Sequence, residues 1–265
     1  MPTPPLISYA HVAKTFDGGR GARVMAVDDV SLDVAVGELL AIVGGSGSGK
    51  TTLLRLANRL IEADSGSITI EGEDVRNVDP ILLRRRIGYV FQSGGLFPHL
   101  TVADNIGITP KLTGTPPTEI SARVDELLDL VRLDRAQYRD RLPHELSGGQ
   151  RQRVGVARAL AAKPRIVLMD EPFGALDPLT RDALGDDFRE LHRTLGLTTV
   201  MITHDMTEAI LLADRIAVMG GGRLLAQGTP SELSESCDAY VGELLRTPRR
   251  QAERLGALLP REGAA

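Results

Sequence analysis

Residues 44–51 read Gly44-Gly45-Ser46-Gly47-Ser48-Gly49-Lys50-Thr51 and satisfy the pattern G-x-x-x-x-G-K-[ST]. The glycines let the backbone fold so that its N–H groups point at phosphate oxygens, while Lys50 can reach the β- and γ-phosphates and the Thr51 hydroxyl can bind Mg²⁺. The pattern lies between an apolar run, Glu38–Val43, and a segment typical of a helix, Thr51–Ile61. It predicts a phosphate-binding loop and leaves kinase, GTPase and ATPase activities open, with an unliganded glycine-rich turn as the alternative.

Two adjacent carboxylates end a second apolar run, Ile166-Val167-Leu168-Met169-Asp170-Glu171. This run predicts a buried strand, and parallel sheets carry their ligand sites at the ends of such strands. Because side chains alternate along a strand, the two acids can have different roles. Asp170 suits Mg²⁺, directly or through water, and Glu171 suits orienting or deprotonating an attacking water. Acids on a solvated surface are the alternative; beside a phosphate loop, the pair favours hydrolysis over transfer.

The overall composition excludes several functional classes. The chain has 265 residues, of which 42% are hydrophobic and 25% charged, as in soluble globular proteins. Its net charge of −4 favours neither nucleic acid nor an anionic surface as a partner, and its single cysteine can form neither an internal disulfide nor a metal cluster. Its apolar runs are far shorter than the roughly 20 residues that span a bilayer, and its first residues lack a secretory signal. We therefore expect a cytoplasmic protein that binds no nucleic acid.

The order of the predicted elements indicates an α/β fold. The prolines between residues 110 and 117 favour a loop before a helix with its apolar face at 124–131. The basic run 84–86 is interpreted as the start of a solvated helix, and Thr229-Pro230 predicts the start of a C-terminal helix. The predicted strands are 7–12, 24–34, 38–43, 67–71, 165–169, 198–203, 216–219 and 223–227.

A further motif resembles that of a known family. Leu146-Ser147-Gly148-Gly149-Gln150, followed by RQRVGVARAL, resembles the signature sequence of the ATPase subunits of ABC transporters. A serine and two glycines at a helix start offer a hydroxyl, bare N–H groups and a helix dipole to an anion. The family's other motifs follow in its order over 7–232: Phe16 as the aromatic before the phosphate loop, Gln92 in YVFQ, Asp170-Glu171, Gly174-Ala175-Leu176-Asp177 as the D-loop, and His204 in ITHD as the switch histidine.

The resemblance implies an ATPase that needs ATP and Mg²⁺ and works as a two-fold dimer. The signature sequence of one copy would close on the ATP held by the other. Phe16 would stack on adenine, Asp177 would organise the dimer interface, and Lys50, Gln92, Glu171 and His204 would be catalytic. The metal ligands would be Thr51, Gln92 and Asp170. The nucleotide would be bound by Phe16, Gly44, Gly45, Ser46, Gly47, Ser48, Gly49, Lys50, Thr51, Thr52, Ser147, Gly148, Gly149, Gln150 and Asp177.

Three of these roles have structural alternatives. Phe16 could be a loop aromatic that packs on the sheet, and Tyr9 competes with it as an adenine partner but falls on a predicted strand. Gln92 could be a solvated amide at a strand end. His204 could be a helix-start residue that bonds its own backbone.

The resemblance also implies a P-loop NTPase core with a mixed sheet, an N-terminal antiparallel β portion and a helical subdomain. We expect a single ABC ATPase domain over 1–265. Residues 1–93 and 163–229 would form the catalytic α/β core, 94–162 the helical subdomain with the signature sequence, and 230–265 a C-terminal helical tail.

Several longer stretches, among them LRRRIGYVFQSGGLFPHLTVADNI, resemble the ATPases of osmoprotectant importers for glycine betaine, choline, carnitine or proline. The resemblance implies separate integral membrane permease subunits, an extracytoplasmic substrate-binding protein as an indirect partner, and a peripheral place on the inner face of the membrane. Leu96, Phe97 and Pro98 would contact a membrane subunit or fill the core of the helical subdomain.

Uptake of another small solute, such as an amino acid, polyamine or sulfonate, is the alternative. Two further alternatives are a soluble ABC-type ATPase without a transport role and an inert nucleotide-binding module. The stretch after the last predicted hairpin is too short for the regulatory domain pair that members of this branch often carry, so we expect no osmosensing by this chain.

Overall fold

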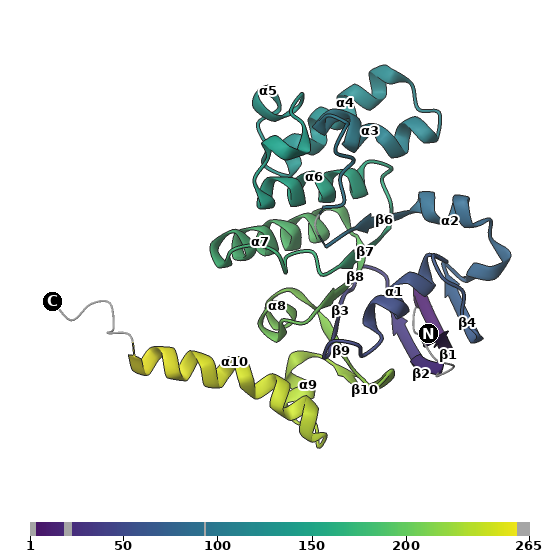
Figure 1. Cartoon of the computed structure of the whole chain (residues 1–265), viewed down its shortest axis with the longest axis vertical. Helices are drawn as coiled ribbons and strands as arrows, with labels where there is room; N and C mark the ends of the chain where they lie inside the picture. The colour runs from purple at the N-terminus through teal and green to yellow at the C-terminus, as the bar shows by residue number, and fades with distance from the viewer. Residues whose placement is uncertain (1–3, 19–22, 93, 259–265) are drawn as a thin grey trace.

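Two β-sheets and the helices around them form the fold (Figure 1). The computed structural model describes residues 4–18, 23–92 and 94–258. The parts of the expected core and tail at 1–3, 19–22, 93 and 259–265 lie outside the described residues. The larger sheet has the order β10-β9-β3-β8-β7-β6, in which β10 pairs antiparallel and the other strands pair parallel. Its strands are β3 (Leu39–Val43), β6 (Ile87–Val90), β7 (Ile166–Asp170), β8 (Thr198–Thr203), β9 (Arg215–Gly220) and β10 (Arg223–Gly228).

The second sheet is antiparallel and has the order β2-β1-β4-β5. It comprises β1 (Ile7–Asp17), β2 (Arg23–Val34), β4 (Ser65–Ile70) and β5 (Glu73–Asp74). The expected α/β fold with a mixed sheet, an N-terminal antiparallel portion and a set of helices is confirmed. The helices are α1 (Lys50–Ala57), α2 (Pro80–Arg86), α3 (Val102–Leu112), α4 (Pro117–Leu130), α5 (Arg135–Tyr138), α6 (Gly148–Leu160), α7 (Pro178–Leu195), α8 (Met206–Leu212), α9 (Pro230–Ser234) and α10 (Ala239–Leu258).

The larger sheet separates two apolar clusters, which explains why its strands are continuously hydrophobic. Along β3, Leu39, Ala41 and Val43 belong to one cluster, while Leu40 and Ile42 belong to the other. The first cluster joins the sheet to α3, α4, α6 and α7, and the second joins it to α1 and the antiparallel sheet. The carboxyl ends of the parallel strands are therefore fixed from both faces.

Three local predictions are wrong in detail. The loop expected before the helix α4 is shorter and covers residues 113–116, because α3 continues through Pro110, which removes one backbone N–H donor from its last turn. The basic run 84–86 ends the helix α2 instead of starting one, and its positive charges lie where the helix dipole favours them. The C-terminal helix that begins after Thr229 is divided into α9 and α10.

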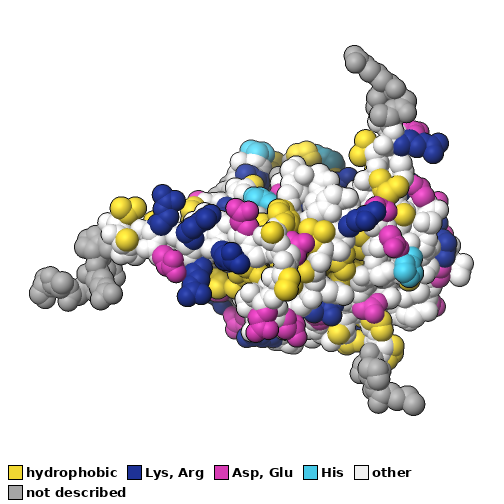
Figure 2. Space-filling model, turned by 90° about the horizontal axis from the view of Figure 1, so that it is seen from below, with side chains coloured by type: hydrophobic (Ala, Val, Ile, Leu, Met, Phe, Trp, Pro, Cys, Tyr) yellow, Lys and Arg dark blue, Asp and Glu magenta, His cyan; other side chains and the backbone are white. Residues whose placement is uncertain are grey.

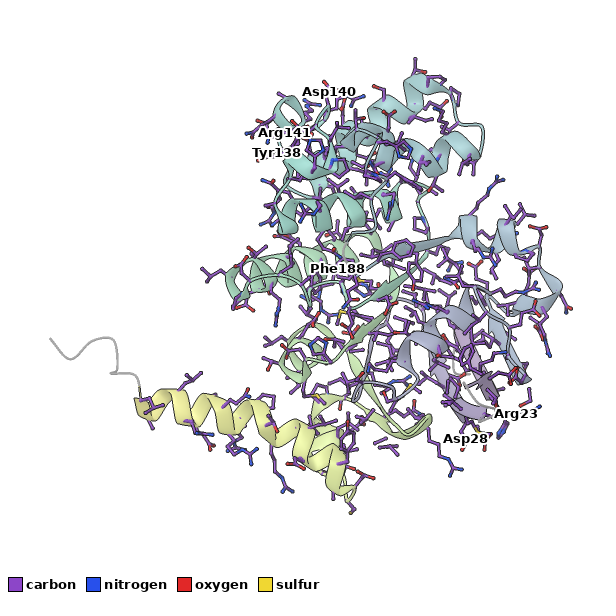
Figure 3. All side chains as sticks on the ribbon, in the orientation of Figure 1. Arg23, Asp28, Tyr138, Asp140, Arg141 and Phe188 are labelled. Atoms are coloured by element: carbon purple, nitrogen blue, oxygen red, sulfur yellow. The ribbon has the colours of Figure 1, made fainter. Side chains whose placement is uncertain are left out.

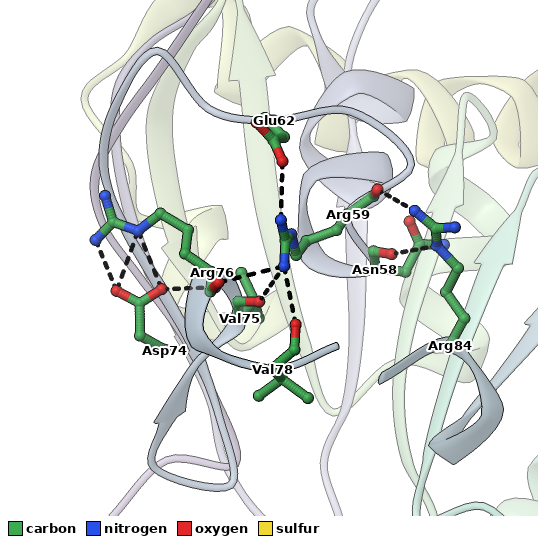
Figure 4. A network of polar contacts seen from close by, with 8 residues as sticks. All are labelled: Asn58, Arg59, Glu62, Asp74, Val75, Arg76, Val78 and Arg84. Atoms are coloured by element: carbon green, nitrogen blue, oxygen red, sulfur yellow. Dashed lines mark hydrogen bonds and ion pairs between the residues drawn. The ribbon is translucent and has the colours of Figure 1, made fainter. Parts of the chain in front are cut away.

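The helix after the phosphate loop is also shorter than expected, since α1 ends at Ala57. Arg59 then adopts a positive φ of 52°, which turns the chain away from the helix axis. Its guanidinium donates hydrogen bonds to the carbonyl oxygens of Val75 and Val78 at 3.1 and 2.9 Å, and Arg84 donates to the carbonyl of Asn58 at 3.1 Å (Figure 4). These contacts with distant residues end the helix, and a local pattern does not reveal them.

Within the described ranges, no helix is both long enough and apolar enough to cross a membrane.

Candidate functional site

The phosphate loop joins the carboxyl end of β3 to the helix α1. Gly49, at the N-cap of α1, has φ +99° and no side chain to cap the helix, so the first N–H groups of α1 keep no side-chain acceptor there. A Cβ at Gly49 would overlap the carbonyl oxygen of Ala26 on β2. The glycine is therefore required both by the backbone conformation and by the close approach of a neighbouring strand. A helix start of this kind suits a bound phosphate.

Lys50 lies inside the loop. Its Nζ donates hydrogen bonds to the carbonyl oxygens of Gly44 at 2.8 Å and Gly45 at 2.9 Å, and its side chain is buried. Burial lowers the pKa of Lys50, while the negative charges of Glu171 and Asp170 oppose that shift. The cation is thus held close to the place where the loop would bind the β- and γ-phosphates.

Asp170 ends the strand β7 beside the first turn of α1. The Thr51 hydroxyl donates to Asp170 Oδ1 at 3.1 Å, and the Tyr89 hydroxyl donates to Oδ2 at 3.3 Å. Together with the Gln92 amide, Thr51 and Asp170 offer oxygen ligands, which Mg²⁺ prefers. Among the described residues no three His, Cys, Asp or Glu side chains gather into a metal cluster. Mg²⁺ bound with a nucleotide commonly takes one or two protein ligands and completes its shell with phosphate and water.

Glu171 lies where three of the sequence motifs meet: its own strand end, the Gln92 segment and the His204 segment. Gln92 Nε2 donates to Glu171 Oε2 at 2.8 Å, and His204 Nδ1 lies 3.4 Å from the same oxygen. Gln92 follows β6 and His204 follows β8, the strands on either side of β7. Glu171 itself has φ +46°, a conformation that costs energy in a non-glycine residue and that gathers at functional sites. The amide of Gln92 and the ring of His204 thus meet at one carboxylate oxygen.

The two candidate aromatic residues differ in exposure. Phe16 lies within β1, which extends beyond its predicted end. The residue is 40% exposed, and Lys14 Nζ lies 5.6 Å from its ring centroid. Tyr9 is 1% exposed, so its ring has no face free for a nucleotide base. Of the two, Phe16 is the one that can stack on a ligand.

The signature sequence forms the start of α6. Ser147 is the N-cap, its hydroxyl accepts from the backbone N–H of Gln150 at 3.3 Å, and the Gln150 side chain accepts from the Ser147 N–H at 2.8 Å. Gln150 Nε2 also donates to the hydroxyl of Tyr138 at 2.9 Å, and the guanidinium of Arg141 lies 4.9 Å from the Tyr138 ring (Figure 3). The Gln150 side chain therefore holds the helix start in shape.

The glycines of the signature sequence have different surroundings. Gly148 is exposed, whereas Gly149 is buried, and a Cβ on Gly149 would lie 2.5 Å from the Thr180 side chain on α7. The helix α6 lies in the helical group at one end of the molecule, and α1 lies beyond the larger sheet from it (Figure 1). Within one chain the signature sequence and the phosphate loop are thus separate.

The D-loop precedes the helix α7. The Asp177 side chain caps α7 by accepting from the Thr180 N–H at 3.0 Å, and hydrogen bonds from Thr180 lower the pKa of Asp177. Asp177 is exposed. A Cβ on Gly174 would lie 3.5 Å from the His204 ring, so this loop runs beside the histidine.

Tyr89 is a site residue that the sequence predictions missed. Its hydroxyl contacts Asp170, and burial together with the charge of Asp170 raises its pKa to about 12, so the hydroxyl stays protonated and donates to the carboxylate. The parallel pairing of β6 with β7 sets Tyr89 opposite Leu168, two residues before Asp170. This register belongs to the fold, so the local sequence carried no signal for the contact.

Glu208 on α8 is a buried carboxyl close to the site. The Thr203 hydroxyl donates to its Oε2 at 2.5 Å, and none of the described residues donates to Oε1. Burial raises the pKa of Glu208 to about 7; the nearby charge of Asp205 adds to this shift, and the Thr203 hydrogen bond, Arg181 and His204 oppose it. The folded protein thus binds one more proton than the unfolded chain between about pH 4.5 and 7.

We expect Glu208→Gln to weaken the pH dependence of stability. Because the folded-state pKa is raised, the stability that protonation contributes is present below about pH 4.5 and is lost as the pH rises through about 7. Urea unfolding at pH 5 and pH 8 should show a difference that is smaller in the variant by about 3 kcal/mol at most. Glu235→Gln, at an exposed position, is the control. An unchanged difference in Glu208→Gln would contradict the assignment.

Comparisons with known proteins show the family of this chain. The family model described as "ABC transporter" matches residues 27–174. The chain is 48% identical over 262 residues to the glycine betaine/carnitine/choline transport ATP-binding protein OpuCA of Bacillus subtilis (strain 168), covering 97% of this chain and 68% of that protein. It is also 48% identical over 229 residues to the sulfate/thiosulfate import ATP-binding protein CysA 2 of Agrobacterium fabrum (strain C58 / ATCC 33970), covering 86% and 64%. The chain therefore spans about two thirds of the length of these relatives.

Solved structures show the same architecture. The dimeric post-hydrolysis state of the ATP-binding cassette MJ0796 bound to ADP and Pi superposes with a TM-score of 0.75 at 31% identity, covering 84% of this chain and 98% of that one. The family model matches more than half of the sequence, and the Bacillus relative matches it almost end to end. The chain belongs to the ATP-binding subunits of ABC transporters.

Proposed function

We propose that this chain is the ATP-hydrolysing subunit of an ABC importer and that it couples the closure of a dimer on ATP to solute uptake. The observation that carries this proposal is the meeting of Gln92, Glu171 and His204 at one carboxylate oxygen, beside the Thr51–Asp170 pair at the phosphate loop. A site that only bound nucleotide would not need a strained acid flanked by two polar side chains.

In the proposed reaction, water attacks the γ-phosphorus of ATP, and the bond between that phosphorus and the bridging oxygen breaks, which gives ADP and phosphate. Residues 44–52, which include Lys50 and Thr52, bind the phosphates, and Phe16 stacks on the adenine. Glu171 orients the water and accepts its proton, while Gln92 and His204 hold Glu171. Thr51, Asp170 and Gln92 would hold Mg²⁺, which would neutralise phosphate charge.

We propose that the active unit is a two-fold dimer in which each nucleotide lies between the loop of one copy and the signature sequence of the other. Ser147, Gly148 and Gly149 start a helix that presents backbone N–H groups, Gln150 keeps that start in shape, and Asp177 lies at the interface. The separation of α6 from α1 within one chain supports this arrangement (Figure 1). The dimeric cassette structure among the similar proteins supports it too.

The direct partners of the dimer would be permease subunits in the membrane, and the chain would lie on the cytoplasmic side of that membrane. An extracytoplasmic substrate-binding protein would be an indirect partner through the permease subunits. Phe97 is 42% exposed and suits such a contact, whereas Leu96 packs against the core. We retain the division into a catalytic core, 1–93 and 163–229, a helical subdomain, 94–162, and a tail, 230–265, as part of this proposal.

The proposed solute is a quaternary amine such as glycine betaine, choline or carnitine. The similarity to the glycine betaine/carnitine/choline transport ATP-binding protein of Bacillus subtilis supports this choice. The equal identity to a sulfate/thiosulfate import protein keeps another small solute as the second candidate.

The experiment is to purify the chain with its membrane subunits in liposomes that contain the matching binding protein. Glycine betaine, choline or carnitine should stimulate ATP hydrolysis severalfold, while sulfate at the same concentration should not. Stimulation by sulfate alone would overturn the solute assignment, and hydrolysis that needs no membrane subunit and responds to no solute would overturn the transport role.

A further inference from the structure

The first turn of α10 is fixed against the body of the protein. The Asp238 carboxylate accepts hydrogen bonds from the backbone N–H groups of Tyr240 at 2.9 Å and Val241 at 3.0 Å. Val241 is completely buried, and Leu244 and Leu245 pack against the same apolar cluster. The Tyr240 side chain therefore starts from a defined backbone position.

Tyr240 reaches from this turn to the phosphate loop. The backbone N–H of Gly45 donates to the Tyr240 hydroxyl oxygen at 2.9 Å, a contact between residues 195 positions apart. A Cβ at Gly45 would lie 3.5 Å from that oxygen, an ordinary contact distance. The interaction is therefore a specific hydrogen bond to the loop backbone, and it does not depend on the absence of a side chain at Gly45.

Gly45 is held on its other side by the loop itself. Its carbonyl oxygen accepts from Lys50 Nζ at 2.9 Å and from the backbone N–H of Ser48 at 3.2 Å. Tyr240 thus fixes the N–H of Gly45, and the carbonyl oxygen of the same residue accepts a hydrogen bond from Lys50. The N–H of Gly45 also belongs to the same planar peptide as the C=O of Gly44, which accepts a hydrogen bond from Lys50 Nζ at 2.8 Å. Rotation of this peptide would move the Gly44 carbonyl and, with it, the lysine.

We propose that Tyr240 is a positioning residue of the phosphate loop: its hydroxyl fixes Gly45, and nucleotide affinity thereby depends on how the helix α10 is seated. This inference rests on the nucleotide-binding role proposed above. Beyond its first turns α10 projects from the body (Figure 1), and Lys and Arg side chains gather along the projecting arm in Figure 2. These side chains belong to Arg246, Arg249, Arg250 and Arg254. A contact made by this arm would be transmitted through the first turn of α10 to the loop.

The test removes a single hydroxyl by Tyr240→Phe in the full chain. Thr247→Val is the matched control, because it removes a hydroxyl of the same helix that donates to the carbonyl of Glu243 at 2.8 Å. We expect the dissociation constant for Mg-ATP to rise about threefold to tenfold in Tyr240→Phe, which is the range for one lost hydrogen bond. Thr247→Val should stay within about twofold of wild type.

Amide hydrogen exchange gives a second readout that a merely structural role would not produce. Without nucleotide, residues 44–50 should exchange faster in Tyr240→Phe than in wild type or Thr247→Val. Since coupling is reciprocal, Mg-ATP should protect residues 239–247 in wild type and protect them less in Tyr240→Phe.

Unchanged affinity in Tyr240→Phe would overturn the inference, as would equal effects of the two variants. If wild type bound no ATP while the exchange difference at residues 44–50 persisted, the proposed function would fail, and with it the effect on affinity. The tether between Tyr240 and Gly45 would then remain as a fact about the loop alone.

Discussion

Glu171→Gln is expected to lower the turnover number for ATP hydrolysis by about 10²- to 10³-fold, the loss typical of a removed general base. Glutamine has nearly the same shape and can still contact Gln92 and His204, which lie 2.8 and 3.4 Å from the carboxylate. It has no basic oxygen to accept a proton from water. Binding of Mg-ATP, which depends on Lys50 and the loop, should stay near the wild-type value.

The same variant should accumulate an ATP-bound dimer, because closure would no longer be followed by hydrolysis. Light scattering with and without Mg-ATP measures this change, and steady-state phosphate release measures turnover. Glu119→Gln on the exposed side of α4 is the control, and it should behave as wild type in both assays. Unchanged turnover in Glu171→Gln would remove the proposed base from the mechanism.

The parts of the site that the sequence predicted are those that depend on contiguous residues. The phosphate loop and the Asp170-Glu171 strand end each combine a local pattern with a neighbouring apolar run, and both appear where they were expected. Gln92 and His204 were assigned through the family resemblance, and parallel pairing on either side of β7 brings them to Glu171.

The remaining features depend on contacts between distant residues, which local patterns do not encode. The residues near Ala57 do not predict the end of α1, because the carbonyls of Val75 and Val78 that bind Arg59 lie on another segment of the chain. The contact of Tyr240 with Gly45 likewise joins the C-terminal helix to the loop after β3. The positive φ of Glu171 is imposed by its surroundings, among them the hydrogen bond from its N–H to Ile202 on β8.

The assignment of the signature sequence to a second copy of the chain leads to a mixing experiment. Lys50→Met removes the cation of the phosphate loop while keeping an apolar stem of similar length. Gly148→Asp places a negative charge at the start of α6, where the proposed dimer binds phosphate. A Cβ at Gly148 would lie 3.7 Å from Leu176, and an acid in the first turn suits the helix dipole, so α6 should stay folded.

Each variant alone should lose nearly all ATP hydrolysis, since both sites of its own dimer carry the defect. In a mixed dimer the two defects fall on the same site, and the other site combines an intact loop with an intact signature sequence. Equal mixing makes half of the dimers mixed, each with one intact site, so activity should recover to roughly a quarter of wild type if the sites work independently. If each chain formed a complete site by itself, mixing would give only the average of the two weak activities, and the two-chain site would have to be abandoned.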